Sequence, residues 1–400
     1  MTVWIVNPFD NLPLEGNRPQ RYWLLARAFA RAGHDVTLWT SDFSHARKAK
    51  RACVCGAARP LGRRGAVVPC GETPGFRVVL VETPPYRRNI GLARVWSHHA
   101  FARRWRALAA GGPPPDVLVT SLPPLALGAA AARVRGARTL WVVDVMDAWP
   151  ETFARVAPRL LLAPLRRTAG RIYRGADALV GVAERYVALA RAYGATCPMR
   201  VVHHGIDAAA PAAAPARTDG AFRLVYAGNM GASYDLATLV AAARALPGVT
   251  LDLAGGGPRE AALRAQAAGC ARIRFHGYLG ADALRALLAA CDTGVVPMFD
   301  ASCVGVPYKL ADYAAAGLPV LNSLSGETAR LLAAYGAGAT YAAGDAAALA
   351  AAAAAWRDAR ATPAWARLRD GARRLAAAFD ARALYGGYVA WVERLRAERV

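Results

Sequence analysis

Two charged side chains near residue 310 have the types and the spacing to bind a diphosphate and a ribose. Lys309 and Asp312 are three residues apart in the segment VGVPYKLADYAAAGLPVL, so they share one face if this segment is helical. Pro307 can begin such a helix and Gly317 can end it. The first turn of a helix offers free N–H groups and a positive dipole end, which favour phosphate. A lysine suits pyrophosphate, and a carboxylate suits ribose hydroxyls.

Lys309 also stands out from the composition of the chain. It is the only lysine after residue 50, whereas arginine is used almost everywhere else. Compositional bias therefore does not readily explain it. The alternative interpretation is an i,i+3 ion pair with Asp312 on a solvated surface. The glycine and proline context favours the ligand site.

A second candidate is the loop after the first predicted strand, PFDNLPLEGNRPQRYW (8–23). It places Gly16, Arg18 and Arg21 ahead of a predicted helix. Free N–H groups and guanidinium groups at such a position could bind phosphate. An ordinary surface loop is the alternative.

A third candidate follows the apolar run that leads into VVDVMDAWPE (142–151). A carboxylate at the end of a buried strand costs free energy unless it serves a purpose. Asp147 is therefore a candidate base or hydroxyl-orienting residue, and capping of the next helix is the alternative. The spacing from Asp144 to Asp147 is not the Asp-x-Asp expected where manganese bridges a diphosphate. No metal site is predicted.

Alternating strand-like and helix-like segments must position these residues. The pattern is that of parallel sheets with helices on both faces, repeated in two doubly wound halves. In such sheets ligands bind at the carboxyl ends of the strands, so two facing halves form an interdomain cleft. The predicted strands are Val3–Val6, Val36–Thr40, Val78–Val81, Val117–Thr120, Thr139–Val143, Ala178–Val182, Met199–His204, Arg223–Tyr226, Thr250–Ala254, Arg272–Phe275, Thr293–Val296 and Pro319–Leu321.

A Pro/Ala-rich stretch (208–221) separates the two halves. We predict an N-terminal domain over 1–205, a C-terminal domain over 206–378 and a closing helix over 379–400 that packs on the N-terminal domain. The closing helix follows from apolar residues spaced three and four apart between Leu384 and Leu395. The alanine-rich segment 346–361 is predicted to be a surface helix.

Two further segments lie at predicted strand ends in the second half. In LDLAGGGPRE (251–260), three glycines allow close approach to a ligand or a partner strand, or form a plain tight turn. His276 and Gly277 belong to the adjoining loop and are expected to face the cleft.

In order and spacing, the motifs of this chain resemble the retaining glycosyltransferases of family 4, which have the GT-B fold. The resemblance spans nearly the whole chain. Besides the segments around Lys309 and Asp147, the motifs that carry it are GHDVTLWTS (33–41), HHGID (203–207), LVYAGNMG (224–231), LDLAGGGP (251–258), IRFHGYL (273–279) and YAAGD (341–345).

The resemblance assigns roles residue by residue. Asp312 matches the second acid of the family's Glu-x7-Glu motif, which is expected at the nucleotide ribose. Val304 stands where the first acid belongs, so backbone at 303–306 is expected to hold the donor sugar instead. Asn229 stands in a segment where many members have an Arg and a Lys that clamp the diphosphate. Gly228 and Asn229, with the later Pro-x-Lys element, resemble a subgroup that acts on bacterial surface polysaccharides, so Lys309 is expected to supply the charge.

The resemblance implies transfer of a sugar from a nucleoside diphosphate sugar, UDP-linked by family frequency, to a glycan or polyprenyl-linked acceptor with retention of configuration. The expected setting is the biosynthesis of surface polysaccharide such as lipopolysaccharide, with the nucleotide sugar as co-substrate and no metal or other cofactor. The expected catalytic residues are Asp147 and Lys309. The expected donor-binding residues are Gly16, Arg18, Gly228, Asn229, His276, Lys309 and Asp312.

Two alternatives to this function remain open. One is a nucleotide-sugar epimerase of the same fold. The other is a catalytically silent GT-B subunit that supports a partner, which Val304 and the missing Arg/Lys clamp make conceivable.

The formal net charge of +22 does not indicate a nucleic-acid partner. The charge is carried almost wholly by arginine, and the sequence has neither a lysine-rich tail nor the motifs of RNA-binding or zinc-finger domains. Anionic lipid or a phosphate-bearing substrate suits the charge better. Two basic amphipathic stretches (93–111 and 155–175) are candidates for peripheral membrane contact, although most such helices only cover their own core.

The seven cysteines are scattered, which indicates a reducing compartment. Cys53, Cys55 and Cys70 lack a fourth ligand and the usual zinc spacing, so we expect no metal there. The N-terminus lacks the pattern of a signal peptide, and no apolar run is long enough to span a membrane. The expected location is the cytoplasm, with possible contact at the inner face of the plasma membrane.

Overall fold

The computed structural model describes residues 1–51, 59–62, 64–69, 73–89, 91–154, 157–207 and 220–399. Contacts divide the chain into unit 1, Met1–Asp207 with Ala381–Val400, and unit 2, Ala208–Asp380. The junctions predicted after residues 205 and 378 each lie two residues from these divisions. The cysteines at 53, 55 and 70 and most of the Pro/Ala-rich stretch (208–219) lie outside the described residues.

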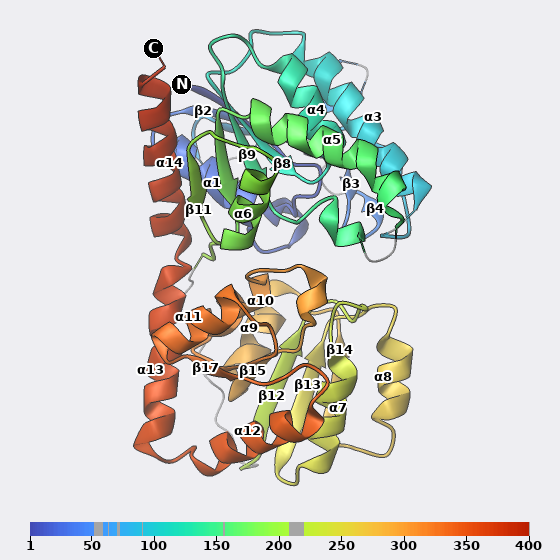
Figure 1. The fold of residues 1–400 in the computed structure, drawn as a ribbon, viewed down its shortest axis with the longest axis vertical. Coiled ribbons are helices and arrows are strands. Elements are labelled where there is room, and N and C mark those ends of the chain that lie inside the picture. Colours follow the sequence, from blue (N-terminus) through green and yellow to red (C-terminus); the bar gives the residue numbers. More distant parts are fainter. Residues whose placement is uncertain are drawn as a thin grey trace. The chain divides into compact units, whose positions relative to one another are not determined.

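Unit 1 is built on a nine-stranded sheet with the order β11-β10-β9-β8-β1-β2-β7-β6-β5 (Figure 1). The strands from β11 to β7 are parallel, as predicted. Their bounds are β1 Thr2–Val6, β2 Asp35–Ser41, β7 Phe76–Val81, β8 Val117–Leu122, β9 Leu140–Val145, β10 Ala178–Gly181 and β11 Met199–Val201.

A short hairpin, β5 (Arg59–Leu61) and β6 (Gly65–Pro69), continues this sheet in antiparallel pairing with β7. A two-stranded ribbon, β3 (Phe43–Ser44) and β4 (Ala49–Lys50), stands apart from the sheet. The sequence did not predict these four strands, because they are short, and β4, β5 and β6 also include a charged residue, glycine or proline.

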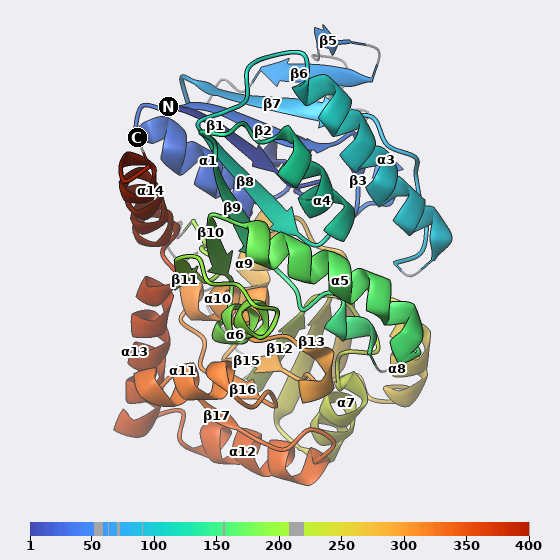
Figure 2. The same ribbon diagram turned by 45° about the horizontal axis from the view of Figure 1, so that its top comes forward.

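Helices cover both faces of the sheet in unit 1 (Figure 2). One face packs against α1 (Arg21–Arg31) and α14 (Ala381–Ala397), whose Tyr385, Tyr388 and Trp391 join the same core as Val3 and Ile5. The predicted closing helix therefore belongs to the core of unit 1. The remaining helices of this unit are α3 Leu92–Ala109, α4 Leu125–Val134, α5 Arg159–Gly175 and α6 Glu184–Ala192.

Unit 2 is built on a six-stranded sheet with the order β14-β13-β12-β15-β16-β17, parallel throughout. Strands β13 and β15 are buried along their whole length, which is why they read as apolar runs in the sequence. The strands are β12 Phe222–Ala227, β13 Val249–Ala254, β14 Ile273–Gly277, β15 Thr293–Val296, β16 Val320–Asn322 and β17 Gly338–Thr340.

The alanine-rich segment forms a helix, α12 (Ala346–Asp358), as predicted. The Asp345 side chain caps it by accepting a hydrogen bond from the Ala348 N–H at 2.8 Å, and Trp356 anchors it in the core. The other helices of unit 2 are α7 Leu236–Ala245, α8 Glu260–Gln266, α9 Ala281–Ala289, α10 Tyr308–Ala315, α11 Glu327–Tyr335 and α13 Pro363–Ala378.

Within the described part of the chain, no helix is both long enough and apolar enough to cross a membrane.

Candidate functional site

Lys309 lies on α10 and reaches the carboxyl end of β12. Its Nζ is so near Gly228 that a Cβ added at that glycine would lie 3.3 Å away. The ammonium group lies 4.0 Å from the ring centroids of both Tyr226 and Tyr234. Among the described residues Nζ has no hydrogen-bond partner, although the residue is only 6% exposed. Two aromatic faces therefore hold a group that can still donate three hydrogen bonds.

Burial lowers the pKa of Lys309 well below its ordinary value. The cause is desolvation, which penalises the charged ammonium form. A phosphate at Nζ would supply the opposite charge and raise that pKa again. An anionic ligand should therefore gain much more binding free energy beside Lys309 than a neutral ligand.

The glycines of the LDLAGGGP segment allow two loops to approach each other closely. Gly255 has a φ of 116°, and a Cβ there would lie 2.0 Å from the Gly228 carbonyl oxygen. A Cβ at Gly257 would lie 2.5 Å from the Asn229 amide oxygen. Of the alternatives open at the sequence level, approach to a partner strand end accounts for these glycines. Asn229 is exposed, and its loop is held in place by close packing against the loop that contains Gly255 and Gly257.

His276 lies in the irregular register between β13 and β14. Its Nε2 is 2.7 Å from Oδ1 of Asp252, a buried carboxylate on the neighbouring strand. One ring nitrogen is therefore engaged in the unit's own sheet. Binding of the donor by His276 stays a prediction, and it would have to use ring atoms other than Nε2.

Asp312 lies on α10 one turn after Lys309 and is half-buried. The predicted helix is confirmed: it begins directly after Pro307 and ends before Gly317, whose φ is 67°. In the preceding loop, the N–H of Val304 donates to Ser302 Oγ at 3.4 Å. The N–H of Cys303 donates to the Asp300 carbonyl at 3.2 Å. These two N–H groups are thus engaged within the loop that was expected to hold the donor sugar.

The N-terminal loop separates its two arginines. Gly16 is exposed, ends a 3-10 turn over Pro13–Glu15 and has a φ of 72°, and Arg18 is half-buried. Arg21 is fully buried, and its Nη1 donates to the Val202 carbonyl at 2.8 Å.

Arg21 also forms a buried ion pair with Asp144, with Nη2 3.0 Å from Oδ2. The interpretation of Arg21 as a phosphate ligand is therefore wrong, because the guanidinium is already occupied within unit 1. The same pair explains how Asp144 is tolerated at the end of a buried strand.

Asp147 follows β9 at the carboxyl edge of the sheet in unit 1. Its Oδ1 accepts hydrogen bonds from the Ala148 N–H at 2.7 Å and from Thr152 Oγ1 at 3.0 Å. Burial raises the pKa of this carboxyl group, and these hydrogen bonds oppose the rise. The helix cap expected as the alternative is not formed: the next helical turn, Glu151–Phe153, has Pro150 at its N-cap and no side-chain cap, and the contacts of Asp147 instead fix the segment from Asp147 to Thr152.

Sequence reasoning missed a group of side chains beside Asp147. The Arg94 guanidinium lies 5.6 Å from the ring centroids of both Phe9 and Trp149. Lys48 lies 5.0 Å from the ring centroid of Tyr86. These residues come from separate loops, so spacing in the sequence could not group them. The one available signal was that Lys48 is one of only three lysines.

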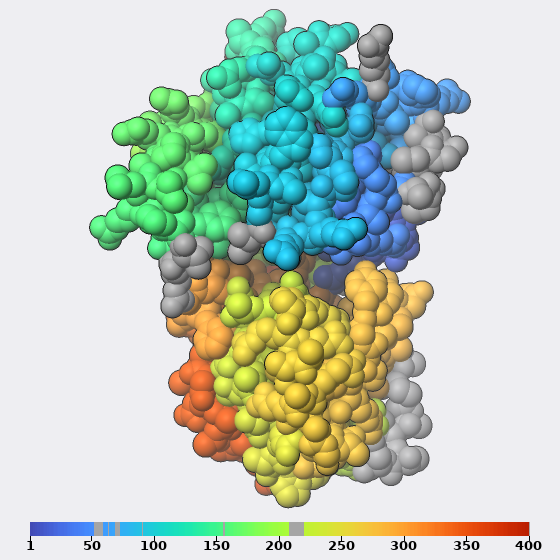
Figure 3. Space-filling view, turned by 90° about the vertical axis from the view of Figure 1, so that its right-hand side faces the viewer, coloured from blue at the N-terminus to red at the C-terminus, as the bar shows by residue number. Residues whose placement is uncertain are grey.

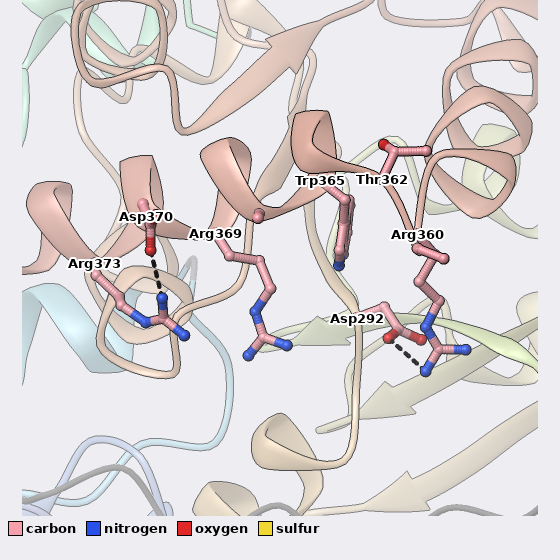
Figure 4. A pocket seen from close by; sticks show the side chains of 9 residues that line it. Asp292, Arg360, Thr362, Trp365, Arg369, Asp370 and Arg373 are labelled. Carbon is pink, nitrogen blue, oxygen red and sulfur yellow. Dashed lines mark hydrogen bonds and ion pairs between the residues drawn. The ribbon is translucent and has the colours of Figure 1, made fainter.

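A cavity of about 460 Å³ in unit 2 contains none of the predicted site residues (Figure 4). Arg360 pairs there with Asp292 at 3.1 Å, and Arg369 and Arg373 line the same space. Asp292 directly precedes β15, so this cavity lies at the amino ends of the strands. Ligands of such sheets bind at the opposite, carboxyl ends. The cavity is therefore not a candidate for the donor site.

Comparison with known proteins covers both units. The family model described as Glycosyl transferase 4-like domain matches residues 19–205, and the model described as Glycosyl transferases group 1 matches residues 221–357. A search of curated protein sequences finds no match.

Solved structures of similar fold include a sucrose-phosphate synthase from Thermosynechococcus elongatus, with a TM-score of 0.75 at 18% identity over 100% of both chains. Anabaena HepE in complex with UDP-glucose has a TM-score of 0.68 at 15% identity, over 98% of this chain and 99% of that one. WaaG, a glycosyltransferase involved in lipopolysaccharide biosynthesis, has a TM-score of 0.65 at 15% identity, with the same coverage. At these identities the likeness concerns the fold.

The two family models and the two Rossmann-like units agree in order and extent along the chain. The protein is therefore a glycosyltransferase with the GT-B fold.

Proposed function

We propose that this glycosyltransferase transfers a sugar from a UDP-linked donor to a glycan or polyprenyl-linked acceptor with retention of configuration, as in the biosynthesis of lipopolysaccharide and related surface polysaccharides. The main support for the donor site is the buried ammonium group of Lys309 beside Gly228. Its Nζ has no hydrogen-bond partner among the described residues. The structures of HepE with UDP and UDP-glucose and the role of WaaG support the donor and the setting.

In the donor complex, Lys309 binds the diphosphate and Asp312 binds the ribose hydroxyls. Gly228 and Asn229 line the same strand end, with His276 near the end of β14, a strand and not the loop expected from the sequence. Gly16 and Arg18 contribute from the N-terminal loop of unit 1. Negative charge grows on the diphosphate as it leaves, so the Lys309 ammonium stabilises the transition state more than the ground state.

Retention follows from attack on the same face from which the diphosphate departs. The bond between the anomeric carbon and the diphosphate oxygen breaks first and leaves a short-lived oxocarbenium-like ion pair. The acceptor hydroxyl oxygen then bonds to the anomeric carbon, and its proton passes to the departing phosphate oxygen. Asp147 orients that hydroxyl group or, as the alternative, accepts this proton in place of the phosphate oxygen. The nucleotide sugar is the only co-substrate in this scheme, which uses no metal.

We include peripheral contact with an anionic membrane in this proposal. Leu92 on α3 is 87% exposed and Leu160 on α5 is 86% exposed, and Trp96 and Leu161 are also exposed. Side chains of α3, in cyan, and α5, in green, lie on the same face of unit 1 (Figure 3). Exposed arginines accompany them on both helices, which suits anionic headgroups. This contact would place the enzyme at the inner face of the plasma membrane, in the cytoplasm.

The test is calorimetric titration of the full-length protein with UDP, GDP, ADP and their sugars. Lys309→Ala and Asp312→Ala are compared with Arg285→Ala and Asp358→Ala, which change exposed residues of unit 2. We expect one nucleotide to bind, and each site substitution to weaken it about tenfold or more while the controls do not.

Two results would overturn the proposal. Failure of every nucleotide to bind the folded protein would favour the silent partner subunit. Formation of an epimerised nucleotide sugar without any acceptor would favour the epimerase.

A further inference from the structure

Four segments of unit 1 bring cationic and aromatic side chains together at the carboxyl edge of its sheet. Phe9 follows β1, Lys48 lies between β3 and β4, Arg94 lies in the first turn of α3, and Trp149 follows β9. Tyr86 follows β7 and contacts this group through its ring. We call Lys48, Arg94 and their contacts the cationic cluster.

The two cations of the cluster are held by neutral acceptors. The Asn89 side-chain oxygen accepts from Lys48 Nζ at 2.6 Å, and the Asn89 carbonyl accepts from Arg94 Nη1 at 2.6 Å. Lys48 Nζ also lies 3.2 Å from His45 Nδ1, and Arg94 Nε lies 3.3 Å from His98 Nε2. Burial lowers the pKa of both histidines to about 3, so they are neutral and accept these bonds.

Neither cation forms an ion pair with a carboxylate in the part of the chain that the structure describes. Asp147 attracts Arg94, but without a hydrogen bond between them. Burial, with Arg94 nearby, lowers the pKa of Lys48 to about 8. Two positive charges are therefore kept close together and partly desolvated, and the attraction of Asp147 offsets only part of them, which leaves a positive site that favours an anion.

Lys48 ends the tight turn between β3 and β4, where its N–H donates to the Ser44 carbonyl at 2.9 Å. Its φ is 55°, in the left-handed region that residues with a side chain seldom adopt. Such a conformation costs about 1 kcal/mol or more and is retained mainly where the surroundings enforce it, often at ligand sites.

We propose that Lys48 and Arg94 bind a phosphate group of the acceptor, so that the acceptor of this enzyme is a phosphorylated molecule. The inference rests on the proposed function and names the acceptor class. The rings of Phe9 and Trp149 flank Arg94 and offer faces on which a sugar ring can stack. Asp147, beside this cluster, then faces the hydroxyl that is glycosylated.

The phosphate can belong to a lipid diphosphate or to a soluble phosphorylated glycan. The exposed Leu92 and Trp96 occupy the same helical turns as Arg94, which would let a lipid chain continue from the cluster. The experiment therefore uses two probes, farnesyl diphosphate and inorganic pyrophosphate, titrated by calorimetry into the full-length protein. Saturating UDP is present throughout so that the probes do not occupy the donor site.

We expect Lys48→Ala and Arg94→Ala each to weaken farnesyl diphosphate binding about tenfold, and the double variant about a hundredfold. Arg94→Lys keeps the charge and should lose about threefold at most. Lys50→Ala and Arg106→Ala, which change exposed cations nearby, should leave the affinity unchanged. Thermal unfolding of each variant verifies that it is folded.

Equal probe affinity in the wild type and the folded double variant would overturn the proposal. Tighter binding of farnesyl diphosphate than of pyrophosphate would support the site with a lipid-linked acceptor, and equal binding would support it with a soluble phosphorylated acceptor. UDP binding and probe binding are measured separately. If UDP does not bind but probe binding depends on Lys48 and Arg94, only the proposed donor site is contradicted.

Discussion

The guanidinium group of Arg21 lies 3.0 to 3.1 Å from the two carboxylate oxygens of Asp144, and neither side chain reaches solvent. The same guanidinium lies 5.7 Å from the ring centroid of Tyr385 on α14. This ion pair thus joins α1, β9 and the last helix of the chain within unit 1.

Removal of one partner of this pair should destabilise unit 1 strongly. We expect Arg21→Ala to lower the free energy of unfolding by about 3–5 kcal/mol, because Asp144 is left as a buried, unpaired charge. Arg27→Ala on the same helix breaks only a partly exposed pair with Asp207 and should cost about 1 kcal/mol or less. Urea unfolding measures both. Replacement of both partners, Arg21→Met with Asp144→Leu, should recover most of the loss, and equal losses in Arg21→Ala and Arg27→Ala would contradict this account.

Arg18 and Arg21 show what the sequence can and cannot predict about a site. Both arginines precede a helix in a glycine-bearing loop, and the local pattern gives them the same chemistry. Their difference comes from Asp144 and Tyr385, which are distant in the chain and meet Arg21 only in the folded unit. Burial of a single side chain depends on such tertiary contacts, which periodicity does not contain.

Lys309 should lower the free energy of unfolding of the protein, although it is needed for UDP binding. We expect Lys309→Met to raise the free energy of unfolding near neutral pH by about 1–3 kcal/mol, because an ammonium group buried without a hydrogen bond is removed. Its folded-state pKa is depressed, so the gain should shrink as pH rises toward the unfolded-state pKa of about 10.4.

The measurement is urea unfolding of the wild type and Lys309→Met across this range of pH. The same variant should lose UDP binding. A variant less stable than the wild type at neutral pH would show that Lys309 is paired in the folded protein.

Asp147 combines hydrogen bonds within its own segment with the expected acceptor-side role, and a substitution can separate the two. Asp147→Asn keeps an oxygen that can accept from Ala148 and Thr152, so unfolding should change by about 1 kcal/mol or less. We expect kcat for transfer to fall about tenfold or more, because the carboxylate is lost.

The pH profile of transfer gives a second readout for Asp147. In the wild type, transfer should increase with pH as the Asp147 carboxyl ionises, with a midpoint above the ordinary value because burial raises its pKa. Asp147→Asn should lack this increase. Thr152→Val removes only the hydrogen bond from Thr152 Oγ1 to Asp147. This variant should retain the increase of transfer with pH.

Asp10 should make unit 1 less stable as pH rises. Burial raises the pKa of this carboxyl group to about 7, and Arg51 opposes the rise. A folded-state pKa above the unfolded value stabilises the protein at low pH, and this contribution is lost as pH rises through about 7. The wild type should lose free energy of unfolding between about pH 4 and pH 8. We expect this loss to be smaller by about 2–4 kcal/mol in Asp10→Asn. Chemical unfolding across that range measures it, and an unchanged loss in the variant would exclude Asp10 as the source.

The exposed apolar residues of α3 and α5 should bind lipid. We expect Trp96→Asp and Leu160→Asp each to reduce sedimentation with phosphatidylglycerol vesicles about fivefold, because one inserted side chain contributes about 1 kcal/mol or more. Tyr278→Asp, at an exposed position of unit 2, serves as the control and should bind as the wild type does. Equal sedimentation of all these variants would remove the membrane contact from the proposed function.

Most parallel strands of both sheets were predictable because strands buried on two faces carry continuous apolar runs, whereas the short and less buried strand β17 was not predicted. The hairpin of β5 and β6 carries no such run and was missed. The composition of the chain singled out Lys309, but not Tyr226 and Tyr234, which enclose its ammonium group from another strand and loop. The cationic cluster was missed for the same reason, since Lys48 and Arg94 are distant in the sequence and meet at Asn89 and Tyr86 only in the folded unit.

Helix α14 has a consequence for how the chain is made. Tyr385, Tyr388 and Trp391 fill the core formed by residues from the first strand onward, although the whole of unit 2 is encoded between them. During synthesis, unit 2 can therefore fold as soon as it leaves the ribosome, whereas unit 1 has to wait with an open apolar face until the final helix emerges. Unit 1 starts before unit 2 in the chain but is completed after it, and part of its apolar core stays exposed in that interval.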